Sequence, residues 1–355
     1  MFRRIQLGVS RATFATGATL ATMAMIATIA AIASAAAWIH SPVAGQQTFE
    51  REIVAKARVF PGVGPGVAAL KCDAAGRYYI LATPATQIGI YAADGKRSGQ
   101  IPNANSGAAK IVYAVDIDLD AKGQLWVADR GANAVKVFAP DGSVVATIPV
   151  VTPTSIVALP DNEVAVETLR SGRLVDVLDE RGKLVRGFGD PSDLEDQKDS
   201  KQFLNRGWLT GDPAGHIYFA FTYAADPTIR KYDRYGYSAY EIALSALEFA
   251  PQDKRHDYLK LDRHTEVPVA KPVITAIGVD PATQEIWTAI GNALLHFSSD
   301  GNRLQTYRTV TKDGARVEPK AILVEPDRLL LAADPIGIFE FVRPDKIPLT
   351  PATER

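Results

Sequence analysis

Short runs of alternating apolar and polar residues, separated by turns rich in glycine and aspartate, occupy most of the chain beyond residue 50. The most regular stretch contains four such runs, at residues 116–120, 125–129, 134–138 and 144–148. Alternation with a period of two is typical of strands that bury one face, and glycine and aspartate favour tight turns between antiparallel strands. This stretch therefore predicts a four-stranded antiparallel meander.

The meander recurs along the chain as a repeat. An apolar residue at the end of the third strand precedes a turn position by four residues, in the pairs Tyr91/Gly95, Phe138/Gly142, Leu178/Gly182, Tyr232/Gly236, Phe297/Gly301 and, with aspartate replacing glycine, Phe341/Asp345. The first turn of a unit places an aspartate before a glycine and an aromatic residue, as in Asp73/Gly76/Tyr79, Asp120/Gly123/Trp126 and Asp212/Gly215/Tyr218. Four-stranded units repeated roughly every 40 to 45 residues are typical of β-propeller blades.

The sequence therefore predicts an all-β fold, a six-bladed β-propeller of four-stranded antiparallel blades within residues 46–343. The last blade lacks a fourth strand before the proline-rich stretch that starts at Pro344. The strand-like segment 49–60 is expected to pair as its outermost strand and so close the ring. Residues 344–355 are expected to form a flexible tail. The blades are expected at about residues 65–102, 111–150, 153–190, 203–245, 272–309 and 317–343.

Two highly charged stretches interrupt the period. Residues 191–205 connect the third and fourth blades, and residues 246–271 connect the fourth and fifth. Both are compatible with a helical turn. Two interpretations stay open, a solvated connection or a cap over one mouth of the channel, because ordered long loops often carry binding residues.

Residues 115–142 resemble the NHL repeat, with an apolar strand ending in aspartate, a glycine turn, a strand ending Val127-Ala128-Asp129 and a strand ending Val137-Phe138 before the next glycine turn. The other units match in part, over about residues 55–343. The resemblance implies a six-bladed propeller and leaves the activity open. The gluconolactonase/senescence-marker and strictosidine-synthase-like enzymes share the broad architecture.

The lactonase-like relatives bind a divalent metal through carboxylates and asparagines around the channel and use a carboxylate as base. The early Glu-Gly-Pro element of those enzymes is absent here, where blade one reads Gly66-Val67-Ala68-Ala69-Leu70-Lys71. Their asparagines do not appear on matching strands either. Calcium or another divalent metal therefore belongs only to an alternative hypothesis, a metal-dependent hydrolase.

Ligands of propellers bind where the innermost strands converge at a mouth of the central channel. Alignment of those strands places Asp116 level with Ser155 and Trp208, and Asp118 level with Lys71. Two interpretations apply to the polar residues near the channel, a ligand-binding set or charges that simply pair with one another. Asp129 also has a structural role open to it, as the residue that caps the loop after its strand. The candidate ligand-binding residues are Asp116, Asp118, Asp129, Glu167, Arg206, Trp208 and Lys320.

Recognisable catalytic chemistry is missing from the sequence. There is no Gly-x-Ser-x-Gly elbow, phosphate loop or His-Glu-x-x-His motif, and the five histidines lack zinc-site spacing. The single cysteine, Cys72, is expected to be a buried strand residue. No catalytic residue, metal site or cofactor is assigned. The leading hypothesis is a binding or scaffold module for a protein, peptide or glycan.

The N-terminus indicates where the protein acts. Arg3, Arg4 and Arg11 precede an uncharged apolar run at residues 12–39, which is long enough to cross a bilayer. Residues 1–45 are therefore expected to be a signal peptide or a membrane anchor, two alternatives that stay open. Either directs the body outside the cytoplasm, to the periplasm or the cell surface. The whole chain has 39 basic and 40 acidic residues, so the exported body is slightly acidic and nucleic acid is not an expected partner.

Overall fold

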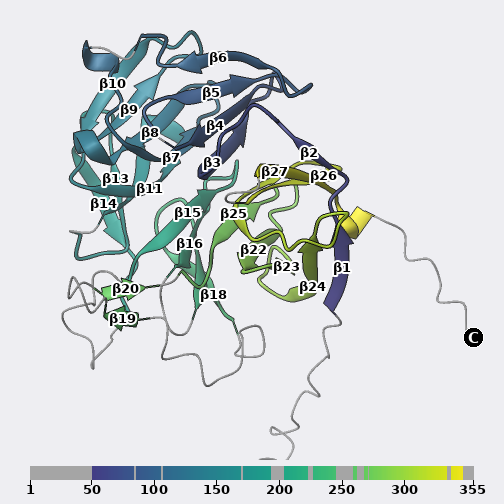
Figure 1. Ribbon diagram of the computed structural model, residues 1–355. Helices are drawn as coiled ribbons and strands as arrows, with labels where there is room; N and C mark the ends of the chain where they lie inside the picture. Colours follow the sequence, from purple (N-terminus) through teal and green to yellow (C-terminus); the bar gives the residue numbers. More distant parts are fainter. Residues whose placement is uncertain are drawn as a thin grey trace, which may run out of the picture. The chain divides into compact units, whose positions relative to one another are not determined.

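Six small antiparallel sheets form a ring, the six-bladed β-propeller that the sequence predicts (Figure 1). The innermost strands of successive sheets contact one another in cyclic order, β3 to β7, β11, β15, β21, β25 and back to β3. Blades one to three contain β3 (Val67–Cys72), β4 (Tyr78–Ala82), β5 (Ile88–Tyr91), β6 (Arg97–Ile101), β7 (Ala114–Leu119), β8 (Leu125–Asp129), β9 (Ala134–Phe138), β10 (Val144–Pro149), β11 (Pro153–Ala158), β12 (Val164–Thr168), β13 (Val175–Leu178) and β14 (Leu184–Phe188). Blades four to six contain β15 (Gly207–Gly211), β16 (Ile217–Phe221), β17 (Thr228–Tyr232), β18 (Ser238–Ala243), β21 (Ala276–Val279), β22 (Ile286–Ile290), β23 (Ala293–Phe297), β24 (Arg303–Val310), β25 (Pro319–Val324), β26 (Arg328–Ala333) and β27 (Gly337–Val342).

The computed structural model describes ten stretches of the chain, all within the unit Phe49–Arg355. No helix in these stretches is long and apolar enough to cross a membrane. Residues 1–45, predicted as a signal peptide or anchor, and residues 347–355 of the predicted tail lie outside them. The described residues are 50–83, 85–104, 107–168, 171–192, 204–222, 227–244, 259–261, 268–270, 272–333 and 337–346.

Segment 49–60 divides between two blades, which corrects the prediction of a single strand on the last blade. β1 (Glu50–Val54) pairs in parallel with β24 of blade five. β2 (Ala57–Val59) pairs antiparallel with β27 as the outer strand of blade six. Its role in closing the ring stays a prediction.

Of the two charged stretches, the second contains a small two-stranded antiparallel sheet, β19 (Leu259–Leu261) and β20 (Pro268–Ala270). The sequence of this stretch is compatible with a helical turn, but its described residues form two short strands instead. Residues 193–203, 245–258, 262–267 and 271 lie outside the described residues, so the cap hypothesis stays untested.

The aspartates of the first turns each hold a turn together and fix an aromatic side chain. Asp120 accepts hydrogen bonds from the backbone N–H groups of Lys122 and Gln124, both at 2.9 Å, and from Trp126 Nε1 at 3.1 Å. Gly123 has a φ of +75°, in the left-handed region that favours glycine. Asp73 with Tyr79 and Asp212 with Tyr218 repeat the aspartate–aromatic bond. The motif seen in the sequence is therefore a local hydrogen-bonding unit that recurs from blade to blade.

Apolar side chains fill every seam between neighbouring blades. One buried cluster lies at each of the six seams among the described residues; at the seam between blades one and two, for example, Leu81 packs with Ile117 and Val127. The third-strand residues Phe138, Tyr232, Phe297 and Phe341 are buried in these clusters, as their fixed spacing from the turn indicates. Burial of large side chains between sheets is the main force that holds such a ring together.

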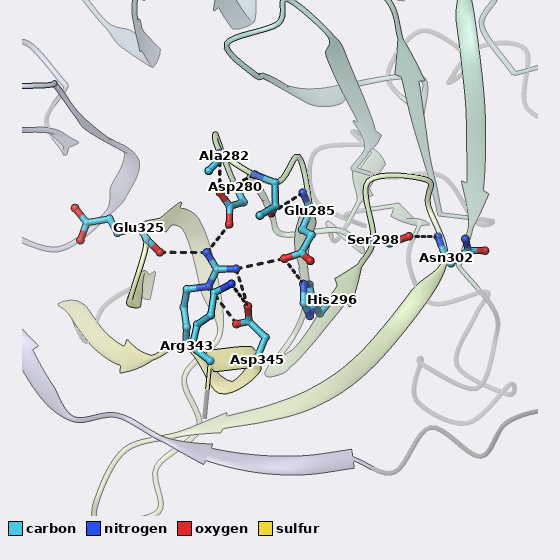
Figure 2. Close-up of polar contacts among 11 residues, drawn as sticks. Asp280, Ala282, Glu285, His296, Ser298, Asn302, Glu325, Arg343 and Asp345 are labelled. Atoms are coloured by element: carbon cyan, nitrogen blue, oxygen red, sulfur yellow. Dashed lines mark hydrogen bonds and ion pairs between the residues drawn. The ribbon is translucent and has the colours of Figure 1, made fainter. Parts of the chain in front are cut away.

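Blades five and six are also joined by an ion cluster around Arg343, which is 1% exposed (Figure 2). Its guanidinium donates to Asp280 in the first turn of blade five, to Glu285 Oε2 at 3.3 Å and to Asp345 Oδ2 at 2.7 Å. Asp345 lies in a short 3₁₀ helix, η7 (Pro344–Lys346), so this part of the predicted flexible tail is ordered. Trp287 of blade five makes no hydrogen bond through Nε1 to any described residue, because Asp280 accepts from Arg343 instead of from the indole.

Candidate functional site

The central channel opens at one mouth into a cavity of about 690 Å³. The innermost strand of each blade contributes to its lining. Blade three contributes only the end of β11, at Val157 and Ala158. The first turns of blades one to four form its rim, with Pro281 of blade five. Cavities of this size commonly hold small molecules or the end of a larger ligand.

The wall formed by blades one and two is charged. Lys71 Nζ lies 2.8 Å from Asp118 Oδ1. The second oxygen of Asp118 accepts a hydrogen bond from the Ala158 N–H of blade three at 2.9 Å. One ion pair and one backbone bond therefore connect three successive blades beside the cavity.

Asp116 lies deeper on the same strand and is 8% exposed. Its Oδ2 accepts hydrogen bonds from Ser155 Oγ at 2.7 Å and from the Ile156 N–H at 3.0 Å. Ser155 Oγ in turn accepts from the Leu209 N–H of blade four at 2.9 Å. The Asp116 side chain thus starts a hydrogen-bonded chain across blades two, three and four.

Burial changes the acid–base behaviour of this wall. It raises the pKa of Asp116 to about 6, against the lowering effects of Lys71 and of the bonds from Ser155 and Ile156. Burial acts to lower the pKa of Lys71, but the carboxylates of Asp118 and Asp116 outweigh it and raise that pKa. Lys71 therefore carries its positive charge at neutral pH, and Asp116 takes up a proton in mildly acidic solution.

Blades five and six present an apolar wall. Ala276, Gly278, Ala321 and Leu323 occupy the positions equivalent to Asp116 and Asp118 and line the cavity. Outside the charged wall, the polar side chains of Trp208 and Thr210 on blade four and of Lys320 on blade six also line the cavity. Trp208 Nε1 is buried without a hydrogen-bond partner, and Lys320 forms no ion pair with any residue that the structure describes.

Three of the seven candidates from the sequence lie outside the cavity lining. Asp129 is fully buried inside blade two, where it accepts from the Tyr113 N–H at 2.9 Å and caps the 3₁₀ helix η2 (Arg130–Ala132). Lys136 Nζ lies 3.1 Å from its Oδ2. The structural role that the sequence left open for Asp129 is therefore observed, and its place among the ligand-binding candidates stays a prediction. Arg206 immediately precedes β15. It therefore lies at one end of the strand, whereas the first turn, which forms the rim of the cavity, lies at the other end.

Glu167 is the unusual member of the set. It pairs in register with Ser155, a position at which the other five blades carry Leu81, Ala128, Ala220, Ala289 and Ala332. Glu167 is 3% exposed, and its Oε2 has no hydrogen-bond partner among the described residues. Burial raises the pKa of Glu167 to about 8, although Arg206 and Arg130 pull it down. Glu167 is therefore largely protonated at neutral pH.

The sequence reasoning brought together Asp116, Asp118, Trp208 and Lys320, all of which line the cavity. It missed Lys71 and Ser155 as contributors. Their equivalence to Asp118 and Asp116 in the strand alignment was the available signal, because side chains at one level of neighbouring inner strands come within hydrogen-bond reach.

The residues present do not fit a divalent metal of the lactonase type. No group of three or more histidine, cysteine or acidic side chains able to hold an ion occurs among the described residues. Asp116 and Asp118 are the two carboxylates nearest each other on the inner strands, and both accept from protein donors. Calcium takes six to eight oxygen ligands from carboxylates, carbonyls and water, and a site for it needs carboxylate oxygens that are not already engaged by protein donors.

No protein-family model matches the chain, and no curated protein matches it in sequence. In three dimensions it is similar to a catalytically inactive variant of virginiamycin B lyase from Staphylococcus aureus solved with quinupristin, at 13% identity over 81% of this chain and 98% of that one, with a TM-score of 0.51. It is also similar to a gluconolactonase from Xanthomonas campestris, at 12% identity over 83% of this chain and 95% of that one, with a TM-score of 0.52. At such identities the likeness shows the propeller fold alone.

Proposed function

We propose that this propeller is a binding module that receives part of a protein or peptide partner in its central channel. The observation that carries the proposal is the cavity of about 690 Å³, with one charged wall and one apolar wall. Such a lining suits recognition, since a few placed polar groups orient a ligand and apolar surface supplies affinity. The alanine, glycine and leucine side chains of the apolar wall suit contact with aliphatic side chains of a peptide.

The place of action is part of the proposal. The uncharged run at residues 12–39 behind three arginines supports an extracytoplasmic module, either anchored or released. The resemblance of residues 115–142 to the NHL repeat supports the same class of interaction propeller.

A lactonase-like hydrolase is the less supported alternative. The fold likeness to a gluconolactonase supports it. The carboxylates of Asp116 and Asp118 speak against it, because they already bond to Ser155 and pair with Lys71.

Fluorine NMR tests whether the channel binds ligands. Full-length protein labelled with 5-fluorotryptophan should give a Trp208 resonance, assigned by its loss in Trp208→Phe. Addition of peptide pools should shift this resonance and leave those of the buried Trp126 and Trp287 in place. If glycan pools shift the Trp208 resonance and peptide pools do not, the ligand is a glycan and the proposed peptide ligand is wrong. If the purified protein instead binds one equivalent of calcium, hydrolyses lactones and shows no peptide-induced shift, the binding-module proposal is replaced by the hydrolase alternative.

A further inference from the structure

The mouth of the ring opposite the cavity carries exposed apolar side chains at blades two and three. Val112 and Tyr113, just before β7, are 46% and 51% exposed, and Val151, just before β11, is 50% exposed. These residues lie at the starts of inner strands, whereas the first turns that form the cavity rim follow the ends of such strands. Single exposed apolar residues are ordinary, but a group of them is typical of an interaction surface.

Val112 and Tyr113 pack directly against η2, the 3₁₀ helix of blade two. The Gly131 N–H donates to the Tyr113 carbonyl oxygen at 3.2 Å. A Cβ on Gly131 would lie 2.7 Å from Val112 Cγ1 and 2.9 Å from Tyr113 Cβ, so both side chains lie against the backbone of this helix.

Val151 is held to the residue that follows the same helix. Asn133 accepts from the Val150 N–H at 3.0 Å through its carbonyl oxygen and from the Thr152 N–H at 2.9 Å through Oδ1. Val151 therefore lies between two bonds to Asn133. The three exposed apolar side chains accordingly flank one loop of four residues, 130–133.

A buried ion pair fixes this arrangement. Both carboxylate oxygens of Asp129 accept from the Val112 N–H, at 3.2 and 3.1 Å, and Oδ1 also accepts from the Tyr113 N–H at 2.9 Å. Lys136 pairs with Asp129 and donates to the Lys110 carbonyl oxygen. Blades one, three, four and six have no acidic residue at the equivalent position, where they carry Ala82, Thr168, Phe221 and Ala333. A partner that docks here therefore meets loops that are already ordered, which lowers the entropic cost of binding.

The charge of this surface is positive. Arg130 belongs to η2, and the exposed Lys110 lies two residues before Val112. Neither side chain forms an ion pair with a residue in the described part of the chain. Asp129 is fully buried and already paired, and burial outweighs the nearby guanidinium groups and raises the pKa of Glu167 to about 8, so that this carboxyl is largely neutral at pH 7. Acidic partners are therefore attracted to this surface and basic partners are repelled.

We infer that the blade-two loop surface, formed by Lys110, Val112, Tyr113, Arg130 and Val151, docks an acidic segment of a partner protein. Aliphatic or aromatic side chains of the segment contact Val112, Tyr113 and Val151, and its carboxylates pair with Lys110 and Arg130. Tyrosine and arginine are enriched among the interface residues that contribute most to binding. This surface lies outside the cavity lining, so the inference goes beyond the proposed channel binding and gives the propeller a second contact at its other mouth.

Fluorine NMR of full-length protein labelled with 3-fluorotyrosine tests the inference. The probes are three libraries of nine-residue peptides, in which leucine, valine or phenylalanine alternates with aspartate and glutamate, with lysine and arginine, or with serine. The acidic library should shift the Tyr113 resonance, assigned by its loss in Tyr113→Phe, and the other two should not at the same concentration. Tyr235 and Tyr237, which are 62% and 74% exposed on blade four, are internal controls and should stay in place. The shift should weaken in 1 M NaCl, because salt screens exposed charges.

Variants separate the charged part of the surface from the apolar part. Arg130→Met should raise the acidic-library concentration at half-maximal shift about 5-fold, and Val151→Ser about 3-fold. The matched controls are Lys96→Met, in an exposed turn of blade one, and Val342→Ser, at a residue 46% exposed on blade six. Each control should change that concentration less than about 2-fold. Circular dichroism confirms that each variant is folded.

Four results overturn the inference. They are no shift of Tyr113 with the acidic library, an equal shift with the basic library, an equal shift of Tyr235 and Tyr237, and an unchanged half-maximal concentration in both Arg130→Met and Val151→Ser. The Trp208 fluorine resonance reports channel binding separately. A shift of Trp208 without one of Tyr113 leaves the proposed function standing and removes only this second surface.

Discussion

The seam between blades two and three and the seam between blades five and six are joined by different means. At the first, Asp116 on β7 bonds directly to Ser155 and Ile156 on β11, beside the channel. At the second, the inner strands meet through apolar atoms, with Gly278 against Ile322, and the polar contacts come from Arg343 after the third strand of blade six. The repeat thus fixes the blades, and the few side chains that depart from it decide how each seam is held.

This difference also explains the two walls of the cavity. Polar seams leave charged groups beside the channel, whereas the seam held by Arg343 leaves the inner strands of blades five and six small and apolar. We expect changes at these two seams, at Glu167 and at the Lys71–Asp118 pair to differ in effect, and they are taken below from the largest to the smallest.

Removal of the Arg343 guanidinium should have the largest effect on stability. Arg343→Met leaves the carboxylates of Asp280 and Asp345 without their buried partner, and loss of one partner of a buried ion pair costs about 3–5 kcal/mol. Urea unfolding followed by circular dichroism measures the free energy of unfolding. The exposed Arg316→Met is the control and should change it by less than about 0.5 kcal/mol. An equal effect of the two variants would show that the cluster does not join the blades.

Loss of the Asp116 carboxylate should come next. Asp116→Ala leaves Ser155 Oγ and the Ile156 N–H without their acceptor, at a cost of about 2–3 kcal/mol for buried groups. Because Ser155→Ala removes the other half of the same bond, the two changes should be non-additive by about 1 kcal/mol or more in a double-mutant cycle. Strictly additive costs would contradict the bond across this seam.

The close approach at the apolar seam predicts a cost for a single methyl group. A Cβ on residue 278 would lie 2.8 Å from Ile322 Cγ2 and 2.9 Å from the Ile322 carbonyl oxygen. Gly278→Ala should therefore destabilise the protein by about 1–3 kcal/mol through overpacking. Gly64→Ala, at a position with no atom within 4 Å of the added Cβ, is the matched control. A neutral Gly278→Ala would mean that blades five and six are free to separate.

Glu167 should make stability depend on pH. Its pKa is raised from 4.5 to about 8 by burial, so the folded state binds the extra proton between these values and stability falls as pH rises through that range. The neutral Glu167→Gln lacks this loss, so its advantage over the wild type should grow by about 1 kcal/mol per pH unit between pH 5 and 8. Unfolding free energies of both proteins at several pH values give the difference. A constant difference would show that Glu167 is ionised in the fold.

The ion pair at the cavity should matter least. Lys71 and Asp118 have side chains that are 26% and 13% exposed, so water screens part of their attraction. Lys71→Met should cost about 0.5–1 kcal/mol in low salt and less in 1 M NaCl. If Lys71→Met lowers the free energy of unfolding more than Asp116→Ala does, the ion pair to Asp118 contributes more to stability than the bonds of Asp116, contrary to this prediction.

The chain pattern predicted the parts of the fold that depend on local chemistry. Alternating strands, turn aspartates with their aromatic partners and the apolar residue before each turn glycine all act within one blade, so the repeat was visible and the count of six blades was confirmed. Asp116, Asp118 and Trp208 could be placed on the cavity lining because the repeat also fixes which residues are level on the inner strands.

What depends on contacts between blades was decided only by the tertiary structure. Arg343 is 63 residues from Asp280, and neither the repeat nor a local pattern reveals that partner. The sequence likewise did not reveal that the Asp129 carboxylate accepts from the Tyr113 N–H beside its own blade. Nor did it reveal that the two halves of segment 49–60 pair with different sheets. The sequence by itself determined the six blades and the polar residues of the inner strands. Only the tertiary structure showed which of those groups are already bonded, as Asp116 and Asp118 are, because that depends on distances between residues far apart in the chain.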